Sequence, residues 1–419
     1  MHDLNLVVAL SAAVVIILGL LSGTIRRGFV SVPMVALGVG LGAGPSGLAL
    51  VDPAVWPDHH RILEEAARFT LAISVMGIAL RTPIASMRAL MRPVILLLTL
   101  GMLGMWLATS ALALLILGLP VVVGLLIGAI LAPTDPVVAS AIVTGRFAQN
   151  HLPDRVRSTL SLESGANDGL GYLFVLLPIP LLQHGVQAGG GAAEALHAWL
   201  VDVVGVGVVL GIAIGLALGA LVGWLLRRLD RAGIVEEHSL LSLSIALSLL
   251  AVAGAKLAGS DGILAAFAAG LGFNLTVDRR EEQAEENIQE AIAKLFNLPI
   301  FVLLGLALPV AEWQALGLPA VLFTLAVLTL RRPPVLALLR PLLRDRLDRR
   351  DVAFLGWFGP IGVAALYYSL LAVRETGIQE AWPLASLVIT TSVVVHGLTA
   401  APLTRRYARA EAHAAGAHQ

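Results

Sequence analysis

The stretch PVILLLTLGMLGMWLATSALALLILGLPVVVGLLIGAILAPT, residues 93–134, contains no Asp, Glu, Lys or Arg. A helix that crosses the hydrocarbon core of a bilayer needs about 20 apolar residues. These residues are therefore long enough for two spans, which we separate at Gly118-Leu119-Pro120. The whole chain of 419 residues is 58% hydrophobic and 13% charged, whereas a soluble domain has about 25% charged residues. A soluble globular enzyme is excluded.

The same criterion predicts an all-α polytopic membrane protein with about thirteen transmembrane helices. The other apolar segments are 5–23, 28–44, 62–80, 158–180, 198–226, 239–256, 259–274, 290–310, 317–338, 352–373 and 382–404. We expect a membrane domain over 1–404, in which inverted repeats at about 1–180 and 239–404 are joined by a linking helix at 198–226. A short cytoplasmic tail at 405–419 would follow.

The arginines predict the orientation in the membrane. Met-His-Asp-Leu-Asn before the first span has no Lys or Arg to supply a positive charge, which argues against a cleaved signal peptide, and Arg26-Arg27 follows that span. If the amino terminus lies outside, the inside loops hold most of the arginines, and only Arg61 and Arg374 interrupt the outside loops. Because cytoplasmic loops are enriched in Lys and Arg, we expect a cytoplasmic carboxyl end. The simplest location is a bacterial inner membrane.

Composition also limits the partners. The chain has 28 basic and 28 acidic residues, so there is no net basic charge to attract nucleic acid. It has no cysteine, which excludes disulfides and thiolate metal sites. We expect membrane lipid as the surroundings and no cofactor.

Two spans contain residues that a continuous helix disfavours. The first interruption is Ala132-Pro133-Thr134-Asp135-Pro136 and the second is Phe358-Gly359-Pro360-Ile361-Gly362. A proline inside a helix costs about 3 kcal/mol, so we expect the backbone to unwind, with Thr134 or Asp135 capping a half-helix that begins at Pro136. Unwound backbone at membrane depth must be buried in protein or line a wet cavity. Corresponding breaks in two halves indicate a transporter whose site lies at the crossing.

The span at 158–180 carries Glu163-Ser164-Gly165-Ala166-Asn167-Asp168-Gly169 in an apolar helix. A charge in the bilayer costs at least about 2.5–3.5 kcal/mol, so two acids there need partners or a function. Ser164 and Asp168 share one helix face, as do Glu163 and Asn167. Asp168 could hold either a proton or a monovalent cation but not both, and this competition is sufficient for exchange. The alternative is an acid pair locked by Arg or Lys.

These motifs are recognisable as a family pattern. Ala-Pro-Thr-Asp-Pro-Val (132–137), Glu-Ser-Gly-Ala-Asn-Asp-Gly (163–169), Phe-Gly-Pro-Ile-Gly (358–362) and Ser-Val-Val-Val-His-Gly-Leu-Thr (392–399) resemble the signatures of the monovalent cation/proton antiporters, in the sodium/proton exchanger branch. The segments 63–68 and 143–148 look more like the fungal plasma-membrane sodium/proton antiporters. The resemblance runs from the first span to the last.

The resemblance implies a secondary active antiporter that exchanges sodium, and also lithium, for protons by alternating access. It implies a homodimer in which each protomer has a dimerisation part and a moving core. Asp168 would be the carboxylate that binds ion and proton, with Glu163, Ser164 and Thr134 as further sodium ligands and Asp135 acting through water or the unwound backbone. Asn167 lies where electrogenic relatives have a second Asp, which implies electroneutral exchange.

The sequence departs from the pattern at Ile361, where many bacterial members have an arginine that pairs with the acid of the sixth span. Glu163 therefore needs another partner, and Arg68 and Lys294 are the candidates because both lie in expected spans. We place Arg331 and Arg332 at the inner end of the span at 317–338.

Other readings stay open. Some relatives with the Gly-Pro-Ile-Gly form also carry potassium and move net charge, so a potassium/proton or an electrogenic exchanger is the alternative. His396 is either a packed polar residue or a proton sensor. A channel is disfavoured because broken helices around one buried carboxylate suit occlusion. An intramembrane aspartyl protease using Asp135 and Asp168 is a remote alternative, since neither has the setting of a shared-proton dyad. No other enzyme activity is expected.

Overall fold

The apolar segments form helices at or near the expected positions. The computed structural model describes residues 2–20, 30–143, 145–184, 192–234, 239–277 and 295–416, which contain helices and no strand. Six described segments are long and apolar enough to cross a membrane: Ile84–Leu117, Val121–Ala139, Asp154–Gln183, Leu196–Arg231, Val310–Leu343 and Ala381–His413. Five shorter apolar helices are Asn5–Leu20, Val32–Ala43, Ser242–Leu257, Gly262–Thr276 and Leu295–Leu306. The all-α polytopic fold is confirmed, and the helices are consistent with thirteen spans.

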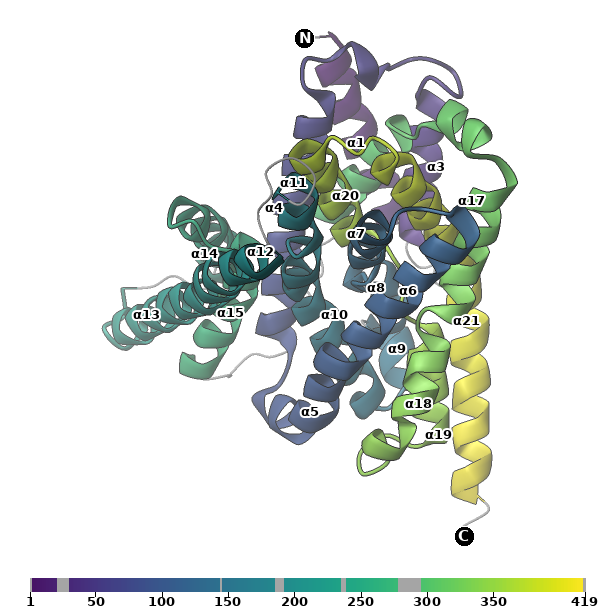
Figure 1. The fold of residues 1–419 in the computed structure, drawn as a ribbon. Helices are drawn as coiled ribbons and strands as arrows, with labels where there is room; N and C mark the ends of the chain where they lie inside the picture. The colour runs from purple at the N-terminus through teal and green to yellow at the C-terminus, as the bar shows by residue number, and fades with distance from the viewer. Residues whose placement is uncertain are drawn as a thin grey trace.

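The first part of the chain supplies the first broken span and the helix with the two acids (Figure 1). Its elements are α1 (His2–Leu20), α3 (Val32–Ala43), η1 (Pro53–Val55), α4 (His59–Arg81), α5 (Ile84–Leu96), η2 (Leu97–Gly101), α6 (Met102–Leu117), α7 (Val121–Leu131), α8 (Pro136–Val143), α9 (Gly145–His151), α10 (Asp154–Val175) and α11 (Pro178–His184). The first broken span is α7 with α8, and the two acids lie on α10.

The second part supplies the other broken span. Its elements are α12 (Ala192–Ala198), η3 (Trp199–Leu210), α13 (Gly211–Arg231), α14 (Ser239–Leu257), α15 (Gly262–Thr276), a helix at 295–306, α17 (Val310–Leu330), α18 (Pro333–Leu343), α19 (Arg349–Trp357), α20 (Val363–Thr376) and α21 (Ala381–Gly416). The broken span is α19 with α20.

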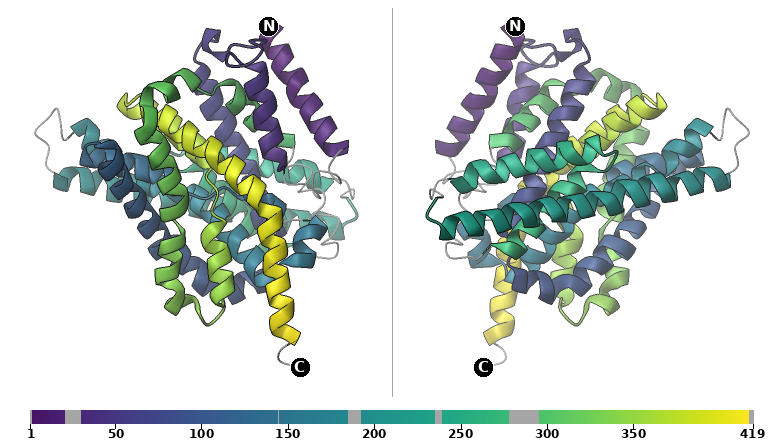
Figure 2. Two further views of the ribbon diagram at one scale, coloured as in Figure 1. Left: turned by 90° about the vertical axis from the view of Figure 1, so that its right-hand side faces the viewer. Right: turned by 90° about the vertical axis from the view of Figure 1, so that its left-hand side faces the viewer.

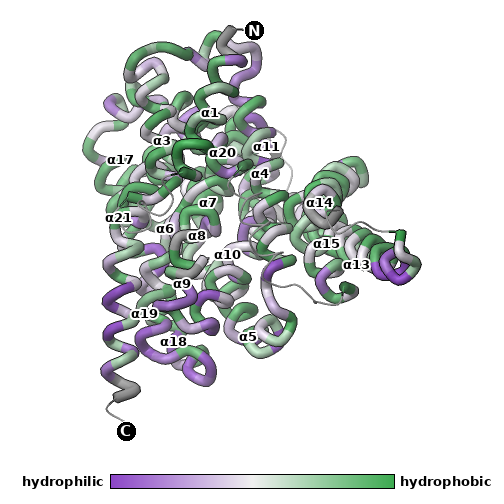
Figure 3. The backbone as a smooth tube through the Cα atoms, turned by 180° about the vertical axis from the view of Figure 1, so that it is seen from behind, coloured by the Kyte–Doolittle hydropathy of each residue, from purple (hydrophilic) through white to green (hydrophobic). Residues whose placement is uncertain are grey.

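The helices form two groups in space. α13, α14 and α15 lie together on one side of the molecule, and the broken spans lie with α6, α10, α17 and α21 on the other (Figures 1 and 2). The two termini are at opposite ends, and hydrophilic residues gather at the carboxyl-terminal end around α18, α19 and the end of α21 (Figure 3). Termini at opposite ends of the molecule are consistent with an odd number of membrane spans.

Small residues let α13 approach α15. A Cβ atom added at Gly215 would lie 2.2 Å from the carbonyl oxygen of Ala265, and one added at Gly219 would lie 1.9 Å from that of Ala269. Without water to drive association, helices in a membrane are held by close van der Waals contact, for which glycine is best suited. The glycines of α13 therefore set the spacing of this group.

Two helical segments extend beyond the expected spans. The span predicted at 317–338 is the pair α17 and α18, so Arg331 and Arg332 lie within the apolar segment 310–343 and not at its inner end. Pro333 and Pro334 occupy the first turn of α18, where a proline needs no amide partner. The last helix, expected to end at 404, continues to Gly416.

Replacing Gly219 with alanine should destabilise the protein because the added methyl group must push α15 away. Overpacking of this kind costs about 1–3 kcal/mol, so Gly219→Ala should lower the thermal midpoint of the protein in detergent. Gly254→Ala on α14 is the matched control: nothing lies within 4 Å of its added Cβ, and alanine favours a helix by about 1 kcal/mol over glycine. Equal stability of Gly219→Ala and wild type would contradict the close packing of α13 on α15.

Candidate functional site

The two breaks touch each other. α7 ends at Leu131 and α8 begins at Pro136, while α19 ends at Trp357 and α20 begins at Val363. The residues between these ends are not helical. The amide of Asp135 donates to the carbonyl oxygen of Pro360 at 2.7 Å, so the unwound segments are joined backbone to backbone. The structure places both breaks where the prolines and glycines predict them.

Asp135 caps two half-helices at once. Its Oδ1 accepts from the amides of Val137 at 2.6 Å and Val138 at 3.2 Å, and its Oδ2 accepts from the amide of Val363. The amino ends of α8 and α20 carry free N–H groups and partial positive charge, which one carboxylate satisfies here. A Cβ at Gly362 would lie 1.9 Å from Oδ2, so this approach requires glycine. Both oxygens of Asp135 are used in capping.

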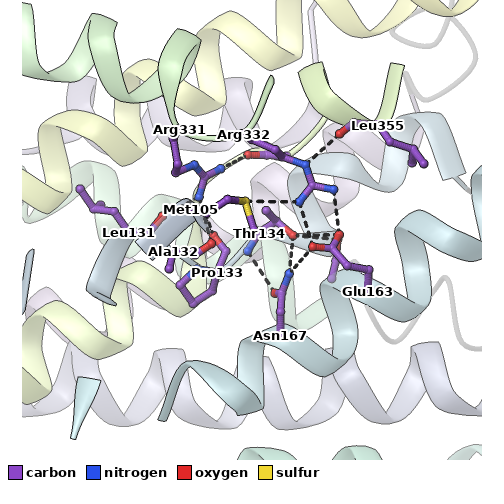
Figure 4. A network of polar contacts seen from close by, with 12 residues as sticks. Met105, Leu131, Ala132, Pro133, Thr134, Glu163, Asn167, Arg331, Arg332 and Leu355 are labelled. Carbon is purple, nitrogen blue, oxygen red and sulfur yellow. Dashed lines mark hydrogen bonds and ion pairs between the residues drawn. The ribbon is translucent and has the colours of Figure 1, made fainter. Parts of the chain in front are cut away.

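Arg331 binds the carboxyl ends of the two half-helices α7 and α19, on the other side of each break from the amides that Asp135 caps. Its Nη1 donates to the carbonyl oxygens of Leu131, Ala132 at 3.2 Å and Pro133 at 3.1 Å, and its Nη2 donates to that of Gly359 (Figure 4). These oxygens follow the carboxyl ends of α7 and α19, where free carbonyls carry partial negative charge. The side chain is buried, and one guanidinium therefore serves both half-helices.

Arg332 is the partner of Glu163. Its Nη1 lies 2.8 Å from Glu163 Oε1 and its Nη2 lies 3.0 Å from Oε2 (Figure 4). The two side chains are 2% and 1% exposed, so this is a buried ion pair with the two-point geometry that suits arginine. Arg332 Nε also donates to the carbonyl oxygen of Leu355 at 2.8 Å.

Arg68 is therefore not the partner of Glu163 that the sequence suggested. Arg68 forms an ion pair with Glu65 one turn earlier in α4, because both lie on one helix face, and Lys294 is outside the described residues. Sequence reasoning missed Arg332 because it places the arginine at the inner end of the span at 317–338, where a basic side chain can reach the interface. The available signal was the apolar sequence up to Leu343, which carries the segment beyond the expected end at 338.

The structure brings four of the expected site residues into one network. Asn167 Nδ2 donates to Thr134 Oγ1 at 2.7 Å and to Glu163 Oε1 at 2.9 Å, and its Oδ1 accepts from the amide of Thr134 at 3.1 Å. Thr134 Oγ1 also lies 3.2 Å from Ser164 Oγ and donates to Glu163 Oε2 at 3.4 Å. Asn167 thus holds the first break against α10.

Asp168 differs from the other acids of the site. It is 0% exposed, and within the described part of the chain neither carboxylate oxygen has a hydrogen-bond partner. It lies on the same face of α10 as Ser164, one turn away. A fully buried carboxylate without a donor is costly in this state, so Asp168 is the group in the site that is available to bind something else.

His396 and Ser392 support the second break from α21. Ser392 Oγ accepts from the amide of Ile361 at 2.8 Å. The ring of His396 lies between two carbonyl oxygens, with Nδ1 2.9 Å from that of Ser392 and Nε2 3.1 Å from that of Trp357. Both ring nitrogens of His396 are thus engaged with the backbone of the second broken span and α21.

Comparison with known proteins gives a consistent family pattern. Residues 9–406 match the family described as "Sodium/hydrogen exchanger, transmembrane". A sodium/proton antiporter of Schizosaccharomyces pombe is 31% identical over 385 residues, which cover 86% of this chain and 81% of that one. One of Saccharomyces cerevisiae is 30% identical over 395 residues, or 87% of this chain, and the chain spans only 40% of its length.

Other similar proteins differ in the named cation. A potassium/proton antiporter, NhaP2, of Shewanella oneidensis is 28% identical over 400 residues, covering 94% of this chain and 65% of that one. Among solved structures, the sodium proton antiporter MjNhaP1 from Methanocaldococcus jannaschii at pH 8 superposes with a TM-score of 0.72 at 19% identity, over 97% of this chain and 98% of that one. This last match shows a shared fold.

Breaking the buried ion pair on one side should cost more than removing both charges. Arg332→Met leaves Glu163 charged and unpaired, at a cost of about 3–5 kcal/mol, whereas replacing both partners with neutral side chains is often close to neutral. We expect Arg332→Met to lower the thermal midpoint strongly and Arg332→Met with Glu163→Gln to recover most of the loss.

Arg68→Met is the control, because its partner Glu65 is partly exposed. Additive effects of Arg332→Met and Glu163→Gln would contradict the pairing.

Proposed function

Because the chain belongs to the sodium/hydrogen exchanger family, we propose that it is a secondary active antiporter that exchanges sodium, and also lithium, for protons. The observation that carries this proposal is the carboxylate of Asp168, fully buried and without a partner beside the two breaks. The transported ions are the substrates, and no cofactor takes part.

Asp168 binds one positive ion at a time. A proton or a sodium ion neutralises the carboxylate, and an empty charged site at membrane depth is costly. The loaded protein can therefore change its accessible side at lower cost than the empty one, which couples the two ions. The hydroxyl oxygens of Ser164 and Thr134, 3.2 Å apart, are the hard ligands that a monovalent cation prefers.

Glu163 acts as an anchor in this scheme. Its oxygens already accept from Arg332, Asn167 and Thr134, so it holds the arginine and the first break in place. Asp135 is likewise occupied by capping amides. We therefore remove Glu163 from the sodium ligands expected from the sequence. Asp168, Ser164 and Thr134 remain.

The exchange is electroneutral. The charge of Glu163 is balanced by Arg332, and Asn167 provides an amide where a second carboxylate would bind another proton. One titrating carboxylate then carries one sodium ion in one direction and one proton in the other. A protease dyad does not fit, because the oxygens of Asp135 are engaged with backbone amides and cannot share a proton with Asp168.

The buried site requires alternating access, since Asp168 is closed to both sides here. The protein acts as a homodimer in which the group with the two breaks moves against the group of α13, α14 and α15. It lies in a bacterial inner membrane with the amino terminus outside and the carboxyl end in the cytoplasm. There it serves sodium transport and pH homeostasis.

Asp168→Asn should abolish exchange at every pH, because an amide neither binds a proton nor balances a cation. The measurement is the loss of a pH gradient in acid-loaded proteoliposomes when sodium, lithium or potassium is added. Asp230→Asn, the same change at the exposed end of α13, should behave like wild type.

Exchange that survives in Asp168→Asn would overturn the assignment of Asp168 as the ion-binding carboxylate. Activity with potassium in place of sodium would favour the potassium/proton alternative, and no activity with any cation would overturn the antiporter function.

The rate of sodium-driven proton release should not depend on membrane potential. One-for-one exchange moves no net charge, so clamping the potential with an ionophore leaves the initial rate unchanged. An electrogenic exchanger would build up a potential that opposes it, and the clamp would then accelerate transport. A faster rate under the clamp contradicts electroneutrality without affecting the assignment of Asp168.

A further inference from the structure

The second broken span also reaches the turn of α10 that carries Asp168. Tyr368 on α20 is 0% exposed, and its hydroxyl donates to the backbone carbonyl oxygen of Asp168 at 2.6 Å. The same hydroxyl lies 3.4 Å from the carbonyl oxygen of Gly169. This contact joins residues 200 positions apart in the sequence, and neither the motifs nor the ion-binding network includes it.

The chain makes room for the tyrosine ring. A Cβ atom at Gly171 would lie 2.7 Å from Tyr368 Cε2 and 2.8 Å from Pro133 Cγ. The ring therefore lies against α10 at the position where α10 also meets Pro133 of the first break. On another side of α10, a Cβ at Gly169 would lie 2.9 Å from the Cα of Leu264 on α15. The turn that holds Asp168 is thus fixed between α15 and Tyr368.

The direction of the hydroxyl proton matters for the chemistry. A phenol that donated to the carboxylate of Asp168 would stabilise the empty anion and compete with the incoming cation. Here the proton is donated to the main chain, and both carboxylate oxygens stay without a partner. The hydroxyl can therefore fix the position of Asp168 without occupying its binding capacity.

We propose that Tyr368 is a positioning residue for cation binding, which fixes the turn of α10 that carries the Asp168 carboxylate. This role rests on the proposed function, because it concerns the affinity of the same site. Tyr368 also links α20 to α10, so the second broken span contributes to the site although its own break supplies no side-chain ligand. The Tyr368 hydroxyl contacts the main chain of Asp168 and not the ion.

Tyr368→Phe tests the proposal, because it removes the hydroxyl and keeps the ring. A hydrogen bond of this kind is worth about three- to tenfold in affinity. We expect the KM for sodium to rise by about that factor, with the maximal rate within about twofold of wild type. Thermal midpoints in detergent verify that the fold is intact.

Tyr367→Phe is the matched control. Tyr367 is the neighbouring residue, is 5% exposed and has its ring centre 5.1 Å from that of Tyr368. Its hydroxyl makes no hydrogen bond among the described residues. Tyr367→Phe should leave both the KM for sodium and the maximal rate unchanged. Gly171→Ala should raise the KM as Tyr368→Phe does, since the added methyl group displaces the ring.

Three results would overturn the positioning role: an unchanged KM in Tyr368→Phe, a lower maximal rate with an unchanged KM, or equal effects of Tyr367→Phe and Tyr368→Phe. If wild type exchanges sodium, Asp168→Asn does not, and Tyr368→Phe keeps the wild-type KM, only the positioning role fails. If wild type exchanges no cation, the proposed function itself fails.

Discussion

Unwound backbone in a membrane must find hydrogen-bond partners inside the protein, and the site is organised around this constraint. The two breaks expose amides at the beginnings of α8 and α20 and carbonyls at the ends of α7 and α19. Asp135 accepts from the amides, and Arg331 donates to the carbonyls. Each side chain serves both broken spans, so the crossing depends on one acid and one base of opposite charge.

The same arrangement isolates the charge that can change. Asp135 and Arg331 are both engaged with backbone, and Glu163 and Arg332 neutralise each other. Asp168 is then the acid at the crossing whose carboxylate has no hydrogen-bond partner among the residues that the structure describes. A proton or a cation that arrives there alters the charge of an otherwise balanced site, which is why one residue can couple two ions.

Local signals in the sequence were sufficient for the breaks but not for the partners. Pro133, Pro136 and Gly359-Pro360 disfavour a continuous helix through local backbone effects, so the interruptions could be predicted without a fold, although single prolines such as Pro93 and Pro402 lie inside helices elsewhere in the chain. The pairing of Glu163 with Arg332 joins α10 to a helix 169 residues away and depends on packing. Prolines such as Pro333 and Pro334 are compatible with a helix end and with a first turn, so they could not show that Arg332 faces Glu163.

The most direct test of competition at Asp168 is a sodium titration at each of several pH values, which gives the KM for sodium and the maximal rate as functions of pH. If a proton and a sodium ion compete for one carboxylate, the KM should rise in proportion to proton concentration on the acidic side, while the maximal rate at saturating sodium stays constant. A KM that is independent of pH, with a maximal rate that falls on acidification, would show that proton and sodium bind at separate groups and would contradict the account.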